Sequence, residues 1–244
     1  MVGRIVMKVV AVSKQFAFII FLSLLFSGTC IGHSLTGMTG LLNIPSADMQ
    51  PDGTLIFGVS YLDKHHAAVM HSYNRYDVLA YYANLTFLPF LELGFRNSGP
   101  INRPGQSFQV DRMVSARVRL LKESEKIPAF VIGGHDIVTS VSKGNQFFGT
   151  LYAVATKHFI TNEHNVGLTI GYAFDAMPHN QFDGFLAGIA VAPSHIPELA
   201  LILEHDSNVI NLGGQLCLFQ HIELLGALQD LKDFSGSFAL KIFL

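Results

Sequence analysis

Eleven histidines are the residues of this sequence that most readily suggest chemistry. His65, His66 and His71 lie together in one polar stretch, and imidazole is the commonest nitrogen ligand of zinc and copper. A metal site also needs further donors at the right distance. No carboxylate is well placed among these histidines in the sequence, so we expect no metal ion there and no cofactor elsewhere.

Two histidine–aspartate neighbours, His135-Asp136 and His205-Asp206, suggest acid–base chemistry. Adjacent residues of a strand point to opposite faces of the sheet, so neither pair is expected to form a dyad. Ser140 and Ser207 are conceivable nucleophiles of an interfacial lipid enzyme, but no nucleophile elbow surrounds either of them. The sequence therefore predicts a protein that is not an enzyme.

Charged residues within apolar stretches form a second group of candidates. They fall on the expected inner face of their strands: Glu92, Arg96, Arg117, Glu198 and Glu204, with Asp111 and Lys241 as additions. Buried charges persist when they are paired or hydrated. They could form an ion-pair network that fills a closed barrel. They could instead form a polar path that contacts a glycan or small solute, with Tyr61, Tyr81 and Tyr82 as aromatic platforms.

The elements that carry these residues read as β-strands because apolar residues alternate with small or polar ones. In residues 166–174 every second residue is large and apolar, and residues 237–244 show the same pattern. One face of each strand is apolar. Such a face could contact lipid in a transmembrane barrel or form the core of a soluble sandwich. Alternation alone leaves both architectures open.

Strand length and loop length favour the barrel. About a dozen strands are expected, many of them near the roughly 9–11 residues that cross a bilayer. Long connections at 63–75 and 97–109 flank a tight turn at 87–89, as in outer-membrane proteins with both termini in the periplasm. The expected strands are 54–62, 76–86, 90–97, 110–121, 128–137, 147–158, 164–175, 182–191, 197–206, 208–218, 221–229 and 234–243.

Composition agrees with lipid contact. Half of the residues are hydrophobic, only 14% are charged, and the mean hydropathy is +0.37. A soluble domain carries about a quarter charged residues. The net charge of −2 gives no basic stripe, so a nucleic-acid partner is not expected.

Residues 1–32 read as a signal peptide. Arg4, Lys8 and Lys14 precede an apolar run at 16–26, and small residues lead to a cleavage point near Gly32. An uncleaved N-terminal anchor is the alternative. Acylation of Cys30 would make a lipoprotein, but the position three residues before it holds serine rather than an aliphatic residue.

Residues 33–53 do not read as a strand, because glycine and proline divide them into turns. A barrel of this size has a narrow lumen that side chains or a small insert can fill. The segment is expected either to tuck into the barrel as a plug or to be an extended lead-in to the barrel domain, 54–244.

The stretch Thr36-Gly-Met-Thr-Gly-Leu-Leu-Asn-Ile-Pro-Ser-Ala47, followed by Pro51-Asp-Gly53, resembles the start of the YjbH family. Further similar segments follow in order: 76–94, 111–123, 128–136, Lys157, Phe159 and 204–207. The resemblance implies an outer-membrane barrel of a Gram-negative bacterium that assists exopolysaccharide biosynthesis or export. It implies periplasmic export components and the polysaccharide as partners. Family members are often larger, so this chain looks like a single-module version.

The sequence therefore predicts an all-β protein, an antiparallel transmembrane barrel of about twelve strands in the outer membrane. Its expected function is a non-catalytic role in exopolysaccharide biosynthesis or export. A general narrow pore or structural barrel is the first alternative. A secreted soluble β-domain that binds a ligand or partner is the second, and an interfacial lipid enzyme is the last.

Overall fold

A computed structural model describes residues 31–67, 76–101, 111–138, 148–177 and 179–244. The expected signal peptide at 1–32, except for Ile31 and Gly32, lies outside these ranges, as do Cys30, His71 and Ser140. The strands are β1 (Thr54–Leu62), β2 (Val78–Thr86), β3 (Leu91–Pro100), β4 (Asp111–Leu121), β5 (Ala129–Val138), β6 (Thr150–Ile160), β7 (His164–Phe174), β8 (Gly184–Pro193), β9 (Leu199–Asp206), β10 (Ile210–Leu218), β11 (Ile222–Gln229) and β12 (Asp233–Phe243).

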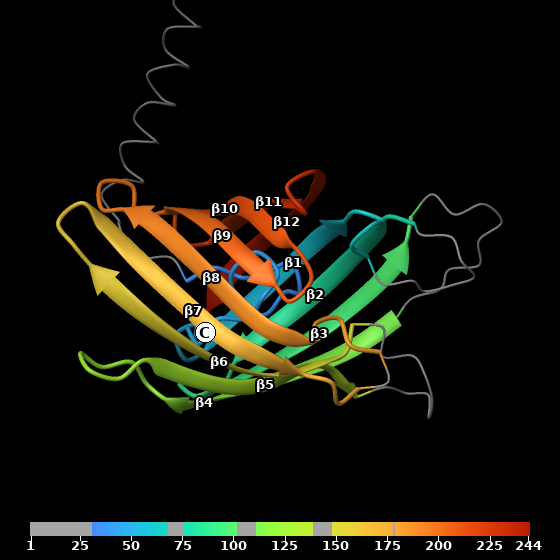
Figure 1. The fold of residues 1–244 in the computed structure, drawn as a ribbon, viewed down its shortest axis with the longest axis horizontal. Helices are drawn as coiled ribbons and strands as arrows, with labels where there is room; N and C mark the ends of the chain where they lie inside the picture. Colours follow the sequence, from blue (N-terminus) through green and yellow to red (C-terminus); the bar gives the residue numbers. More distant parts are fainter. Residues whose placement is uncertain (1–30, 68–75, 102–110, 139–147, 178) are drawn as a thin grey trace, which may run out of the picture.

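Each strand pairs antiparallel with its neighbours in the sequence, and β1 pairs with β12 to close the barrel (Figure 1). The prediction of an all-β antiparallel barrel of about twelve strands is confirmed, and every observed boundary lies within three residues of the expected one. Within the described ranges, no helix is long and apolar enough to cross a membrane.

Alternating side chains explain why these segments form a barrel wall. In β7, Leu168, Ile170 and Tyr172 are exposed on the outer surface, whereas Thr169 and Ala173 are buried inside. Branched and aromatic residues favour extended backbone, and the small inner residues leave space in the lumen. The wall therefore presents small side chains to the lumen and bulky apolar side chains to the outer surface.

The barrel carries its apolar and polar residues in the reverse of the usual arrangement. Large apolar side chains on the outer surface come from every strand of the barrel, whereas several charged side chains are almost completely buried inside. In a soluble protein the largest apolar patch is normally a few hundred Å². The buried charged side chains include Glu92, Arg96, Arg117, Asp136, Glu204, Asp206, Glu223 and Lys241.

The two ends of the barrel differ in their connections. We call the end where β1 begins and β12 ends the turn end; its links are 87–90, 122–128, 161–163, 194–198 and 219–221. The opposite end, the loop end, carries the links 63–77, 101–110, 139–149, 175–183, 207–209 and 230–232. The expected asymmetry between long and short links is present in the first two thirds of the barrel.

Candidate functional site in the plugged lumen

Residues 33–50, which we call the plug, lie inside the barrel and are almost entirely buried (Figure 1, blue). The chain enters at the turn end, turns back at Leu42–Ile44, and leaves to begin β1. Two isolated bridges, His33 with Thr39 and Gly40 with Pro45, hold the plug to itself. Side chains of β2, β3, β4, β6 and β9 to β12 hydrogen-bond to it, so the segment lies within the lumen.

The first turn of the plug requires glycine at position 37. Its φ is +85°, and an added Cβ would lie 2.5 Å from Cγ of Tyr82 on β2. Ser34 N donates to the Met38 carbonyl at 2.8 Å, and Asn84 Nδ2 donates to the Gly37 carbonyl at 3.0 Å. A left-handed backbone and a close approach to the wall both exclude a larger residue here.

Glu204, on β9, holds the tip of the plug. Its Oε2 accepts the backbone N–H of Leu42 at 2.9 Å, and its Oε1 accepts that of Asn43 at 2.8 Å. Asn211 Nδ2, on β10, donates to Oε1 at 3.1 Å. An irregular segment has no ladder to satisfy its N–H groups, so this carboxylate takes the place of a partner strand.

Glu92 and Arg117 hold the middle of the plug. Both side chains are fully buried, with Arg117 Nε 3.2 Å from Glu92 Oε2. Glu92 Oε1 accepts Thr39 N–H at 2.8 Å, while Arg117 donates to the carbonyls of Thr39 and Asp48. The ion pair therefore also satisfies backbone donors and acceptors of the plug, which offsets the desolvation of two buried charges.

The base of the plug is held at the turn end by three strands. His33 Nδ1 contacts Glu223 of β11, which forms an ion pair with Lys241 of β12. Gln215 Nε2, on β10, donates to the carbonyls of His33 at 2.9 Å and Leu41 at 2.9 Å. Glu223 and Gln215 were absent from the sequence candidates. Glu223 could have been found, because it alternates with the exposed Leu224 on the same strand.

A second set of buried polar side chains includes Arg96 on β3 and His135 on β5. The Arg96 guanidinium carbon is 4.3 Å from the ring centroid of Phe148, and the His135 ring is 5.0 Å from that of Tyr152. Among the described residues, neither ring nitrogen of His135 has a hydrogen-bond partner. This group is buried and polar but makes few of the hydrogen bonds that buried polar atoms normally make.

His135 and Asp136 do not face opposite sides of the wall, contrary to the expectation. Both are buried, because the β4–β5 register shifts between Val114 and Ala116 and Asp136 adopts a φ of 50°. A bulge turns one residue of the strand away from regular alternation. For His205-Asp206 the expected alternation is present, since Asp206 is buried and His205 is only partly so.

Two candidates lie at the ends of the barrel and not deep in the lumen. Asp111 is the half-buried first residue of β4, at the loop end. Glu198 comes one residue before β9, at the turn end, and lines a cavity of about 230 Å³. The strand expected from residue 197 begins at Leu199, and both carboxylate oxygens of Glu198 are buried without a hydrogen-bond partner among the described residues.

A larger cavity of about 550 Å³ opens beside the plug at the turn end, between β6 and β10. Glu123, Lys157 and His158 lie along it with Asp48 and Gln215. Glu123 Oε2 is 2.7 Å from His158 Nδ1, and Lys157 Nζ is 3.1 Å from Glu123 Oε1. Burial alone would raise the pKa of Glu123, but hydrogen bonds from His158 and Lys157 outweigh it and lower that pKa. The cavity can hold a polar ligand.

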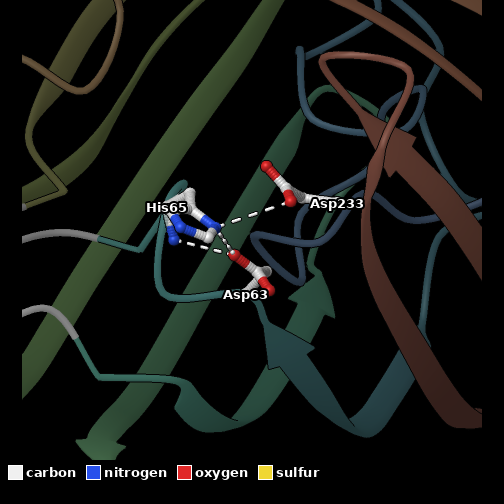
Figure 2. Close-up of side chains that lie close together, drawn as sticks. All are labelled: Asp63, His65 and Asp233. Carbon is white, nitrogen blue, oxygen red and sulfur yellow. Dashed lines mark hydrogen bonds and ion pairs between the residues drawn. The ribbon is translucent and has the colours of Figure 1, made fainter.

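The expectation that no carboxylate lies near the loop histidines is wrong. Asp63 and Asp233 lie against His65 at the loop end (Figure 2). Asp233 is distant in the sequence and reaches the histidine only because β12 pairs with β1. No sequence spacing reveals that proximity.

Replacing Glu204 with alanine should destabilise the barrel by about 1–3 kcal/mol, because buried N–H groups of the plug lose their acceptor. The measurement is equilibrium urea unfolding of the refolded chain in detergent micelles. Glu125→Ala is the matched control, because Glu125 is exposed. Equal stability of the two variants would contradict the role given to Glu204.

Glu123→Gln should lower the thermal midpoint at pH 7. A carboxylate whose pKa is lowered by folding stabilises above its unfolded value, about 4.3, and this contribution is lost as the pH falls through the folded pKa. The deficit relative to the unsubstituted chain should therefore vanish in acid. Glu163→Gln, in the exposed β6–β7 turn, should have little effect at either pH. A deficit independent of pH would contradict this explanation.

Comparison with known protein families gives a match. The family model YjbH, described as "Exopolysaccharide biosynthesis protein YbjH", matches residues 33–208. This range covers the plug and β1 to β9. No curated protein matches the chain. Because the match covers most of the sequence and includes the plug and the residues that hold its tip and middle, this chain belongs to the YjbH family of exopolysaccharide biosynthesis proteins.

Proposed function

We propose that this protein is an outer-membrane β-barrel that assists exopolysaccharide biosynthesis or export without catalysing a reaction. The family supports the association with exopolysaccharide. The observation that carries the membrane location is the reversed barrel, with apolar residues outside and buried charges inside. Strands of 8 to 11 residues are long enough for a tilted crossing of the hydrocarbon layer.

The plug favours a supporting role over a general pore. Glu92, Arg117 and Glu204 are three of the charges proposed for a solute path, and all three hold the plug instead. Phe148 and Phe182, from links at the loop end, pack into the same buried cluster as plug residues. Charges engaged in this way also make poor catalytic groups, which supports a non-catalytic role.

The turn end is the side on which we place periplasmic partners. In outer-membrane barrels the short turns face the periplasm and the longer loops face outward. The cavity of about 550 Å³ opens at this end and presents Lys157, Glu123 and Asn165. Hydrogen-bonding groups of both charges suit a sugar hydroxyl or a polar segment of an export component.

The decisive experiment combines localisation with a phenotype. Membranes of the bacterium that carries this protein are separated, and the protein is run on gels with and without boiling. We expect it in the outer-membrane fraction with a heat-dependent mobility. Deletion of its gene should reduce secreted polysaccharide, measured as hexose in the medium, and the unsubstituted gene should restore it. Recovery as a soluble periplasmic protein would overturn the membrane location. Unchanged polysaccharide would overturn the role in export.

A charge on the outer wall tests the membrane location more finely. Leu203, on β9, is exposed on the outer surface, whereas Phe219 lies in a turn at the turn end. Leu203→Arg should destabilise the barrel by about 2–4 kcal/mol in lipid vesicles, while Phe219→Arg should cost about 1 kcal/mol or less. Urea unfolding in vesicles measures both. A soluble protein would tolerate both substitutions equally, and that result would count against a lipid-facing wall.

A further inference from the structure

We propose that Asp63, His65 and Asp233, with His66 hydrogen-bonded to Asp233, form a binding site for a divalent transition-metal ion, with Zn²⁺ as the best fit. The site lies at the loop end, where the first and last strands of the barrel meet (Figure 2). It is separate from the plug and from the cavities at the turn end. The proposal does not depend on the role in exopolysaccharide export.

The donor atoms lie at separations that suit one metal ion. His65 Nδ1 is 2.8 Å from Asp63 Oδ1 and 3.5 Å from Asp233 Oδ1. Tetrahedral zinc with bonds of about 2.0–2.1 Å places its ligand atoms about 3.3 Å apart. One nitrogen and two carboxylate oxygens, all within 4.8 Å of one another, therefore need only small side-chain movements to share an ion.

His66 holds one of the ligands in place. Its Nε2 is 3.1 Å from Asp233 Oδ2, on the other oxygen of the same carboxylate. Asp233 thus lies between the two imidazoles and can bind the ion while it remains hydrogen-bonded to one of them. Such a carboxylate–histidine contact orients a ligand and fixes its tautomer in metal sites.

The backbone holds these residues in place before any ion arrives. Asp63 follows β1, and its N–H donates to Ser235 Oγ of β12 at 3.0 Å. His65 N–H donates to Asp63 Oδ1 at 2.8 Å, and the N–H groups of His66 and Ala67 donate to the Asp63 carbonyl at 3.0 and 2.8 Å. The turn is therefore tied both to itself and to the last strand.

The chemistry of the donors selects the class of ion. Imidazole nitrogen favours Zn²⁺, Cu²⁺ and Ni²⁺ over Ca²⁺ and Mg²⁺, which prefer oxygen ligands. The two carboxylates balance the charge of a divalent ion, and Lys232 nearby is paired with Asp230. His65 is 55% exposed, so an ion can enter from solvent.

A bound ion would link the two ends of the strand meander. Asp63 and Asp233 flank the β1–β12 pairing, the contact that closes the barrel. A ligand that binds only the folded state stabilises it by RT ln(1 + L/Kd), where L is the free ligand concentration and Kd the dissociation constant. Zn²⁺ should therefore raise the thermal midpoint of the closed barrel.

The test uses the full chain, folded in detergent micelles and freed of metal with a chelator. ZnCl₂ is titrated against a chromophoric zinc indicator, and CoCl₂ gives an absorption spectrum that reports coordination. We expect one equivalent of Zn²⁺ per chain. Asp233→Asn and His65→Ala should each weaken binding at least tenfold, and His195→Ala, an exposed histidine at the turn end, should leave it unchanged.

Three results would overturn the proposal: no stoichiometric Zn²⁺ binding, equal loss in the His195→Ala control, or full affinity in the Asp63→Asn/Asp233→Asn double variant. Heat-dependent gel mobility checks that each variant is folded. His65→Gln provides the same test if an aspartate variant fails to fold, because the His65 side chain is exposed and does not pack in the buried core.

Discussion

The whole arrangement depends on one constraint: backbone N–H groups buried inside a barrel must find acceptors. The plug has almost no ladder of its own, so the wall supplies carboxylates at the points where the plug needs them. Charges that would be costly alone are stabilised because together they satisfy donors and acceptors of the plug backbone. The same constraint explains why the inner residues between them are small. An added Cβ at Gly188 would lie 2.3 Å from the Leu41 side chain of the plug.

Much of this architecture could be predicted from the sequence, because a period of two records which side of a wall each residue faces. Glu92, Arg117 and Glu204 followed from that period, and the strand boundaries followed from the turns between them. The period fails where the backbone is irregular. His135 and Asp136 share a side because of a bulge, and residue types alone do not reveal where a bulge lies.

Contacts between residues that are far apart in the sequence could not be predicted, for a different reason. Asp63 meets Asp233 only because a meander of twelve strands closes on itself. The closure is a global property of strand number and tilt, and local spacing carries no information about it. The partners of the plug show the same limit: its fold could be suspected from glycine and proline, but its acceptors lie on strands throughout the chain.

The plug also has a consequence for how the barrel assembles. His33 contacts Glu223 across 190 positions of the chain, and the plug is hydrogen-bonded to strands from β2 to β12. The first described segment thus obtains its last partners from the final strands to be synthesised. Contacts of such high sequence separation slow folding, because the entropy of loop closure is lost before the contact can form. Barrel closure and plug insertion should therefore be one coupled event, late and slow, in which an open sheet with an unseated plug is the species most exposed to misassembly.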